Sequence, residues 1–423
     1  MKGNDRRIVL FTAGSHGLVH TYELSIPILM TVWLAEFSVT AAALGLAVTV
    51  GYGLFGVGAL PGGVLVDRFG SKPLIIGCLL GMGVAFLLAA AAPSFPTLVL
   101  ALALWGIAAS VYHPAGLALI SKGVTRSGTA FGYHGIGGNL GIALGPLVTV
   151  LLLLQFDWRV VTAALVLPTV VVVAYGLAVE FDETAAVETA SRADGGSGDD
   201  SGSASDTKGQ LTVGAILSDS RALFTLGFSL VFLIVMLSGL YYRAFLTFLP
   251  DLLSDLLDGV LHLELVDPES PYADEFDVSR YLYVGILVFG VAGQYLGGRL
   301  ADRIAPERAL AYVLATLATL AGLVVPAVAL GLLPFLAVAL LLGVALFTIQ
   351  PLQQATVAAY SPSSVRGLSF GYTFLAIFGI GALGAGLAGA VLTYADVAAL
   401  FVVLAGIAAT GATLTVVLRR LTR

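Results

Sequence analysis

The sequence alternates between long apolar segments and short polar connections. A helix that crosses a membrane needs about 20 mostly apolar residues. Twelve segments meet this requirement, near residues 8–33, 40–66, 73–92, 95–121, 128–154, 158–179, 222–250, 281–301, 309–329, 333–358, 367–393 and 396–418. The pattern predicts an all-α membrane protein with twelve transmembrane helices.

The composition supports a chain whose solvent is mostly lipid. Hydrophobic residues make up 58% of the chain and charged residues 11%, whereas a soluble domain carries about 25% charged residues. This excludes a soluble enzyme. The net charge of −6 arises mainly from acidic residues within 180–206 and 251–277, which argues against nucleic-acid binding.

The positive residues set the expected orientation in the membrane, because Lys and Arg favour the cytoplasmic side of short loops. Of the 20 Lys and Arg residues, seventeen fall at helix ends or connections that share a side with the N-terminus. The three that do not are Arg159, Arg243 and Arg280. We therefore expect a multi-pass protein of the cell membrane with both termini in the cytoplasm.

The chain divides into two halves joined by a polar segment. Residues 180–210 are rich in Ser, Gly, Ala and Asp and cannot bury a core. The run from Gly63 to Arg68 recurs from Gly298 to Arg303, 235 residues later (302 − 67), which indicates an internal repeat. The predicted organisation is a six-helix bundle over 1–179, an acidic disordered cytoplasmic linker over 180–213, and a six-helix bundle over 214–423 with an acidic external loop over 251–280.

Two motifs combine glycine with charged or kinking residues. The connection after the second segment contains Gly63, Asp67, Arg68, Gly70 and Lys72, and its degenerate copy keeps Gly298, Asp302 and Arg303. The fifth segment contains Gly137, Gly141, Gly145 and Pro146; glycines four apart allow close helix packing, and proline kinks a helix. In both motifs the sequence resembles the major facilitator superfamily.

The resemblance implies two pseudo-symmetric six-helix bundles that rock around a site at mid-membrane. It also implies that Asp67 meets the N-terminus of span eleven, near Gly367 to Ser369, in only one of two conformers, so that this loop motif biases which side is open. The span-five motif looks like the family's antiporter motif. A closer resemblance, in Ser15-His16-x-x-x-His20-x-Tyr22 and Tyr112-His113-Pro114, is to the fosmidomycin-resistance group of exporters.

Polar residues inside the apolar segments are costly and mark functional positions. His16, His20 and Glu23 are spaced at i, i+4 and i+7, so they share one helix face. The family places spans one, four, seven and ten around the central cavity, and most of the polar residues fall there. The predicted substrate and proton cavity comprises His16, His20, Tyr22, Glu23, His113, His134, Asn139, Tyr241, Tyr242, Arg243, Gln350, Gln353 and Gln354.

Three interpretations of these polar residues stay open. Histidines titrate near neutral pH and could exchange protons; the same residues could instead form interhelical hydrogen bonds that only pack the bundle. His16 and His20 have a spacing that suits a metal ion, but no dense set of further ligands is evident, so we expect no metal and no cofactor. Glu23 and Arg243 follow tyrosines in equivalent spans and are predicted to pair as an external gate; the alternative is that each is hydrated in the cavity, or that Arg243 extends outward to the membrane surface.

The most favoured function is a secondary transporter, not an enzyme, that exports a small organic drug or metabolite in exchange for protons by alternating access. The alternatives are a proton-coupled uptake symporter, a non-transporting membrane sensor of the same fold, and a membrane-embedded metalloenzyme. The expected partners are the small-molecule substrate, protons and the lipid bilayer, and we expect a monomer.

Overall fold

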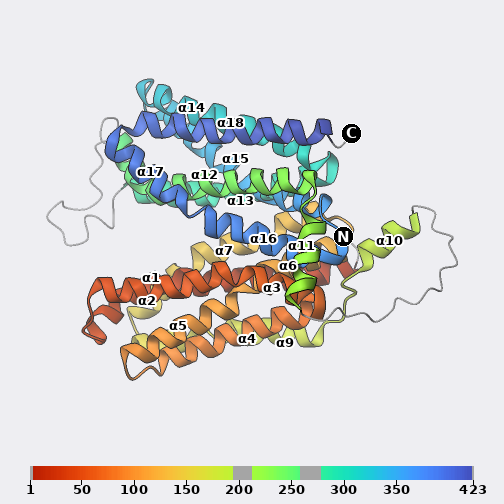
Figure 1. Ribbon diagram of the computed structural model, residues 1–423. Helices are drawn as coiled ribbons and strands as arrows, with labels where there is room; N and C mark the ends of the chain where they lie inside the picture. Colours follow the sequence, from red (N-terminus) through yellow and green to blue (C-terminus); the bar gives the residue numbers. More distant parts are fainter. Residues whose placement is uncertain (1–2, 194–211, 258–277, 422–423) are drawn as a thin grey trace. The chain divides into compact units, whose positions relative to one another are not determined.

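The computed structural model describes residues 3–193, 212–257 and 278–421, and they contain helices but no strand (Figure 1). The first part of the chain forms α1 (Gly3–Glu36), α2 (Ala41–Val57), α3 (Ala59–Phe69), α4 (Ser71–Ala90), α5 (Phe95–Ser110), α6 (Tyr112–Gly123), α7 (Ser127–Leu153), α8 (Trp158–Ala164), α9 (Leu167–Ala178) and α10 (Ala185–Ala193). The second part forms α11 (Val213–Leu223), α12 (Leu226–Leu257), α13 (Val278–Arg303), α14 (Pro306–Ala329), α15 (Leu332–Ala359), α16 (Arg366–Phe374), α17 (Leu383–Tyr394) and α18 (Val397–Leu421).

The described residues provide ten helical segments long and apolar enough to cross a membrane. An eleventh is the pair α2 and α3, which is bent by 42°. The predicted eighth span corresponds to α13, whose 26 residues extend about 39 Å at 1.5 Å per residue. α13 is not among the ten, and it carries Gln294, Arg299, Asp302 and Arg303 toward its C-terminal end.

Several helix boundaries follow from local sequence. The bend between α2 and α3 occurs at Gly58, where an added Cβ would overlap the Ser110 side chain. α3 ends at Gly70, whose φ of 85° lies in a region that side chains other than glycine rarely adopt. α8 begins after Asp157, whose carboxylate accepts a hydrogen bond from the backbone N–H of Arg159 at 2.9 Å, as expected of an N-cap.

The described chain forms two compact units. Unit 1 comprises Met1–Phe228 with Val357–Leu375, and unit 2 comprises Ser229–Thr356 with Ala376–Arg423. Unit 1 therefore includes α16, which packs against α3 and α6. The predicted division at 180–213 stays a prediction because 194–211 lie outside the described residues, as do 258–277 of the predicted external loop.

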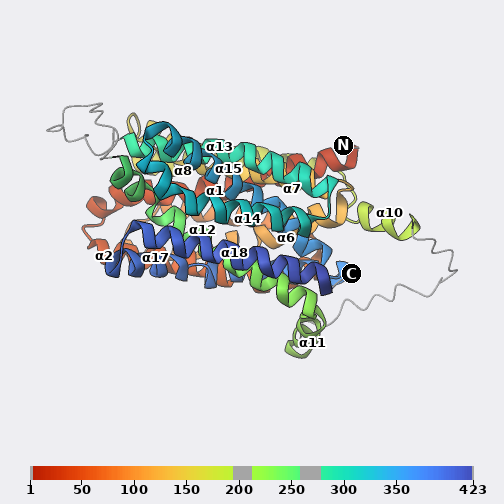
Figure 2. The same ribbon diagram turned by 90° about the horizontal axis from the view of Figure 1, so that it is seen from above.

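Each unit contains a closely packed helix pair among its described residues. In unit 1, α1 and α7 lie side by side along much of their length (Figure 1). In unit 2, α14 and α18 lie side by side in both views (Figures 1 and 2). This packing fixes which polar residues of α1 lie beside which residues of α7 along the two helix axes.

Candidate functional site

The span-five glycines of α7 pack directly against α1. An added Cβ at Gly137 or Gly141 would overlap the backbone of Ala13 or Gly17, and one at Gly145 would lie 2.7 Å from Cα of Thr21. The spacing of four residues on both helices keeps these small positions in one ridge. The motif thus brings the backbones of α1 and α7 into close contact at the level of His16.

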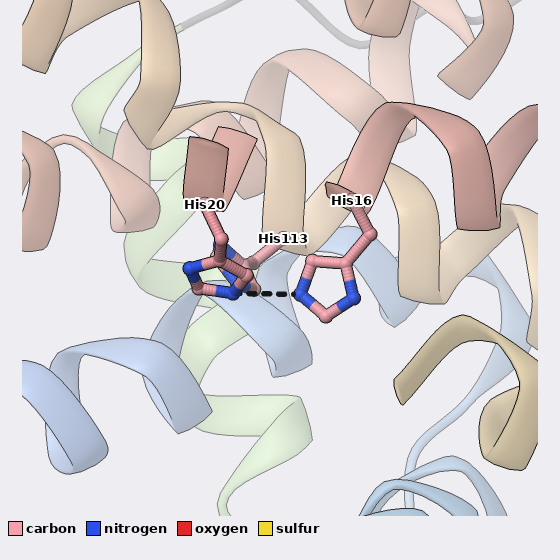
Figure 3. A group of neighbouring side chains, drawn as sticks. All are labelled: His16, His20 and His113. Carbon is pink, nitrogen blue, oxygen red and sulfur yellow. Dashed lines mark hydrogen bonds between the residues drawn. The ribbon is translucent and has the colours of Figure 1, made fainter. Parts of the chain in front are cut away.

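His16, His20 and Glu23 form a continuous chain of polar contacts along α1. Nδ1 of His16 lies 2.7 Å from the backbone carbonyl oxygen of His134 on α7. Nε2 of His16 lies 3.0 Å from Nε2 of His20 (Figure 3), and Nδ1 of His20 lies 2.6 Å from Oε2 of Glu23. The stripe expected from helical spacing is therefore one connected network.

Two more histidines close around this chain from other helices. The ring of His134 stacks on His16 with a centroid distance of 3.9 Å and an interplanar angle of 11°. The ring of His113, from α6, meets His16 edge-on at 5.2 Å and lies 4.2 Å from Phe374 of α16. His134 is fully buried, and neither of its ring nitrogens has a hydrogen-bond partner among the described residues.

Two tyrosines that are not among the predicted cavity residues contact this cluster. The hydroxyl of Tyr112 donates to the backbone oxygen of Thr12, and its ring stacks on His16 at 5.6 Å. The hydroxyl of Tyr52 donates to the backbone oxygen of Glu23 at 2.7 Å. Tyr112 stands in the motif Tyr112-His113-Pro114, so its sequence signal was present; Tyr52 carries no such signal.

One group of described residues has donor atoms close enough to hold a metal ion, namely His16, His20 and His113, whose atoms lie within 4.8 Å of one another (Figure 3). Two imidazole nitrogens bound to one tetrahedral metal at about 2.0–2.1 Å would stand roughly 3.3 Å apart. The two Nε2 atoms of His16 and His20 stand at 3.0 Å, the separation of a hydrogen bond. This arrangement favours a shared proton over a metal.

The predicted cavity residues divide between the two units. His16, His20, Glu23, His113 and His134 come together in unit 1. Tyr22 does not join them, because its hydroxyl lies 2.6 Å from Oγ1 of Thr169 on α9 and its ring packs against Phe86. Asn139 lies on α7, and its amide nitrogen has no hydrogen-bond partner among the described residues.

The predicted cavity residues of unit 2 carry amides, phenols and one guanidinium. Nε2 of Gln294 donates to Oε1 of Gln350 at 2.6 Å, although Gln294 is not among the predicted cavity residues. Tyr241 and Gln353 are buried, and Tyr242 packs edge-on against Phe347. Arg243 lies half-buried on α12, and Gln354 on α15. A shared cavity between these residues and the histidines, and the pairing of Glu23 with Arg243, stay predictions.

The loop motif makes the contact with span eleven that the resemblance implies. The two carboxylate oxygens of Asp67 accept hydrogen bonds from the backbone N–H groups of Gly367 and Leu368, each at 2.8 Å. Nζ of Lys122 lies 3.1 Å from Oδ1 of Asp67. An added Cβ at Gly63 would overlap the backbone of Gly367, so glycine permits this approach. The gating role of the contact stays a proposal.

The rest of the loop motif lies beside the start of the predicted linker. The carboxylate of Glu183 accepts from the backbone N–H groups of Ser71 and Lys72, at 2.8 and 3.0 Å. Nζ of Lys72 donates to the backbone oxygen of Val179 at 2.7 Å, and Arg68 lies over the ring of Phe69. The copies Gly298, Asp302 and Arg303 lie at the C-terminal end of α13.

Known proteins resemble this chain in sequence. A family model described as Major Facilitator Superfamily matches residues 12–382. The chain is 43% identical over 108 residues to the puromycin resistance protein pur8 of Streptomyces alboniger, which covers 25% of this chain and 22% of that protein. It is 26% identical over 162 residues to the inner membrane transport protein YnfM of Escherichia coli (strain K12), covering 37% of this chain and 38% of that protein.

The chain thus matches between about one fifth and two fifths of the length of these curated relatives. Two solved structures share its fold. The proton:xylose symporter XylE aligns with a TM-score of 0.66 and 14% identity over 97% of this chain and 94% of that chain. The human organic anion transporter MFSD10 aligns with a TM-score of 0.62 and 18% identity over 98% and 100%. The predicted helical fold is confirmed.

Proposed function

The chain belongs to the major facilitator superfamily, and from this premise we propose that it is a proton-coupled exporter of a small organic compound in the cell membrane. That it is a multi-pass membrane transporter rather than an enzyme follows from the family and the fold. Proton coupling and export are the proposed parts. The observation that carries the proposal is the buried chain of titratable side chains His16, His20 and Glu23 on α1.

Proton coupling is supported by the kind of side chain in that network. Histidine changes its charge close to neutral pH, and a carboxyl group within a membrane span is too costly to keep without a role or a partner. Four histidines and one glutamate from α1, α6 and α7 meet in unit 1. Such a set can take up and release protons as the site opens to one side or the other.

Export is supported by one relative. A match covering 25% of the chain is to a protein named for resistance to puromycin, and a transporter confers resistance most simply by moving the compound out of the cell. The matched relatives support the superfamily and not specifically the fosmidomycin-resistance group. That finer resemblance, in Tyr112-His113-Pro114 and the stripe of α1, points to export as well.

Alternating access is supported by the contact at Asp67. Its carboxylate sits against the first N–H groups of α16, where a negative charge is stabilised by unpaired helical N–H groups. We propose that this contact forms in the conformer closed to the cytoplasm and breaks when that side opens. The contact therefore sets the balance between two conformers, not the affinity for the substrate.

Transport measured in vesicles tests the function. The protein is reconstituted with its cytoplasmic face outward, an acidic lumen is imposed, and puromycin is added outside as the first of a panel of drugs and metabolites. We expect a compound to accumulate in the lumen as protons leave it, and a protonophore to abolish the accumulation. Movement of compound and protons in the same direction would establish a symporter, and no flux with any compound would favour a sensor.

A further inference from the structure

We infer that His16, His20 and Glu23 form a single proton-binding unit, which holds one exchangeable proton at its Glu23 end and, once deprotonated, binds an organic cation that carries an N–H donor. This rests on the proposed exchange of substrate for protons and names the atoms and the class of compound. Figure 3 shows the two imidazoles that form the centre of the unit.

The number of protons in the unit follows from its contacts. The carbonyl oxygen of His134 can only accept, so Nδ1 of His16 donates to it. The contact between the two Nε2 atoms needs one proton, and the contact between Nδ1 of His20 and Oε2 of Glu23 needs another. The three contacts need three protons, whereas two neutral imidazoles and a carboxylate hold two. The contacts therefore fit the loaded unit, with three protons and no net charge.

The exchangeable proton belongs at the Glu23 end. The side chains of His20 and Glu23 are 12% and 15% exposed, whereas His16 and His134 are buried. Charge separation costs least where water can approach, so an imidazolium of His20 beside the Glu23 carboxylate, or neutral His20 beside the protonated acid, is favoured over a charged His16. His16, held by the backbone of α7 and stacked on His134, is the fixed end.

The groups around the unit do not supply a second acid. The titratable groups in contact with it are His113 and Tyr112 on α6, His134 on α7 and Tyr52 on α2. The helices packed against α1 also carry Lys72 and Cys78 on α4, Lys122 on α6, Tyr133 on α7 and Tyr175 on α9. Lys72 donates to the backbone oxygen of Val179, and Lys122 pairs with Asp67. Among the described residues that contact the unit, none is a further carboxylate or a lysine. Loss of the proton therefore leaves unit 1 with one uncompensated negative charge at this site.

The deprotonated unit is an acceptor site. Without the proton, either Nδ1 of His20 faces a carboxylate oxygen at 2.6 Å or the two Nε2 atoms face each other at 3.0 Å with no hydrogen between them. Both are repulsive contacts between lone pairs. The two side chains therefore move apart until a hydrogen-bond donor lies between them. An organic ammonium group supplies the donor and the positive charge, and one proton exchanged for one monovalent cation conserves the charge of the site.

Nuclear magnetic resonance of the purified full-length protein with ¹⁵N-labelled histidine tests the proton count. We expect wild-type His16 to be neutral with its proton on Nδ1, and the ¹⁵N signals of His20 to change as the pH is raised, because one proton leaves either His20 itself or the Glu23 carboxyl group that donates to it. In Glu23→Gln the amide donates to Nδ1 of His20 and replaces the proton, so this pH-dependent change should disappear. Glu36→Gln is the matched control on α1, because Glu36 pairs with Arg159 at 2.8 Å and leaves the unit intact.

Proton release on binding tests the class of compound. Puromycin, which carries an amino group, is added to unbuffered detergent-solubilised protein with a pH-indicator dye. We expect about one proton released per bound puromycin in the wild type and in Glu36→Gln, and none in Glu23→Gln. Binding of puromycin without proton release, or unchanged titration of His20 in Glu23→Gln, would overturn the inference. So would simultaneous shifts of His16, His20 and His113 with micromolar Zn²⁺ at neutral pH, because they would show a metal site.

The two measurements separate this inference from the proposed function. Export driven by a pH gradient without the expected signals of His20 would leave the function standing and place the proton elsewhere. The expected titration in a protein that transports no compound of the panel would confirm the proton-binding unit and reject the exporter.

Discussion

The polar residues within the spans of unit 1 and unit 2 differ in kind. Unit 1 collects four histidines and Glu23, which can gain and lose protons, around α1. Among the described residues, unit 2 places Gln294 and Gln350 in a pair of amides, with Arg243 on α12. Amides do not titrate and the arginine side chain keeps its charge. Among the described residues, the connected network of titratable side chains within the spans lies in unit 1, so the proposed proton exchange is tested there.

The largest expected effect concerns Glu23. In Glu23→Gln the proton-binding unit is satisfied without an exchangeable proton, so accumulation of substrate against its gradient should fall at least about a hundredfold. Exchange of internal for external substrate at equal concentrations should also fall for a cationic substrate, because the variant keeps no negative charge to bind it, and should persist for a neutral one. Radiolabelled flux in vesicles measures both. Glu36→Gln serves as the control, and uphill transport of normal rate in Glu23→Gln would show that unit 1 does not carry the proton.

The second largest effect is expected in the loop motif of unit 1, and a smaller one in its copy in unit 2. Asp67→Asn removes the charge that accepts from Gly367 and Leu368. Hydrogen bonds to a charged group contribute about 1.5–3 kcal/mol, so we expect transport about 10- to 100-fold slower while the protein remains folded. Asp302→Asn should have a smaller effect, because Ala305 replaces the glycine found at Gly70. Cysteine accessibility on the cytoplasmic side reports the conformer, and equal effects of the two variants would reject this difference.

A packing variant tests whether α7 positions His16. In Gly138→Ala the added Cβ would overlap the imidazole of His16 and displace it from the His134 carbonyl. Overpacking costs about 1–3 kcal/mol, and we expect transport to fall about tenfold together with a lower thermal midpoint. Gly77→Ala is the control, since no atom lies within 4 Å of its added Cβ. A Gly138→Ala protein with normal ¹⁵N signals for His16 would count against this positioning.

The smallest effect concerns the amides of unit 2. Gln350→Leu leaves Gln294 without its acceptor, and hydrogen bonds within a membrane contribute about 0.6 kcal/mol on average. We expect a change of roughly threefold in the apparent substrate affinity and no change in its dependence on pH. A pH profile shifted in Gln350→Leu would instead mean that unit 2 takes part in proton binding.

The sequence alone determined the features that depend on local pattern. Apolar segments predicted the helices, and the spacing of His16, His20 and Glu23 predicted one shared face, because a helix repeats every 3.6 residues. The same period explains why Tyr22, two residues after His20, turns away toward α9. The motif at Asp67 pointed to the start of α16 only through family resemblance.

Only the tertiary structure decided which helices meet. It brought His113 and His134 to His16, paired Gln294 with Gln350, and placed Glu183 at the start of α4. It also showed that His16, His20 and Glu23 share one chain of contacts, from which the proposed number of protons is inferred. These contacts join residues between 56 and 118 positions apart, and their geometry is fixed by the close packing of helices at glycines such as Gly137 and Gly141. Local periodicity carries no information about that packing.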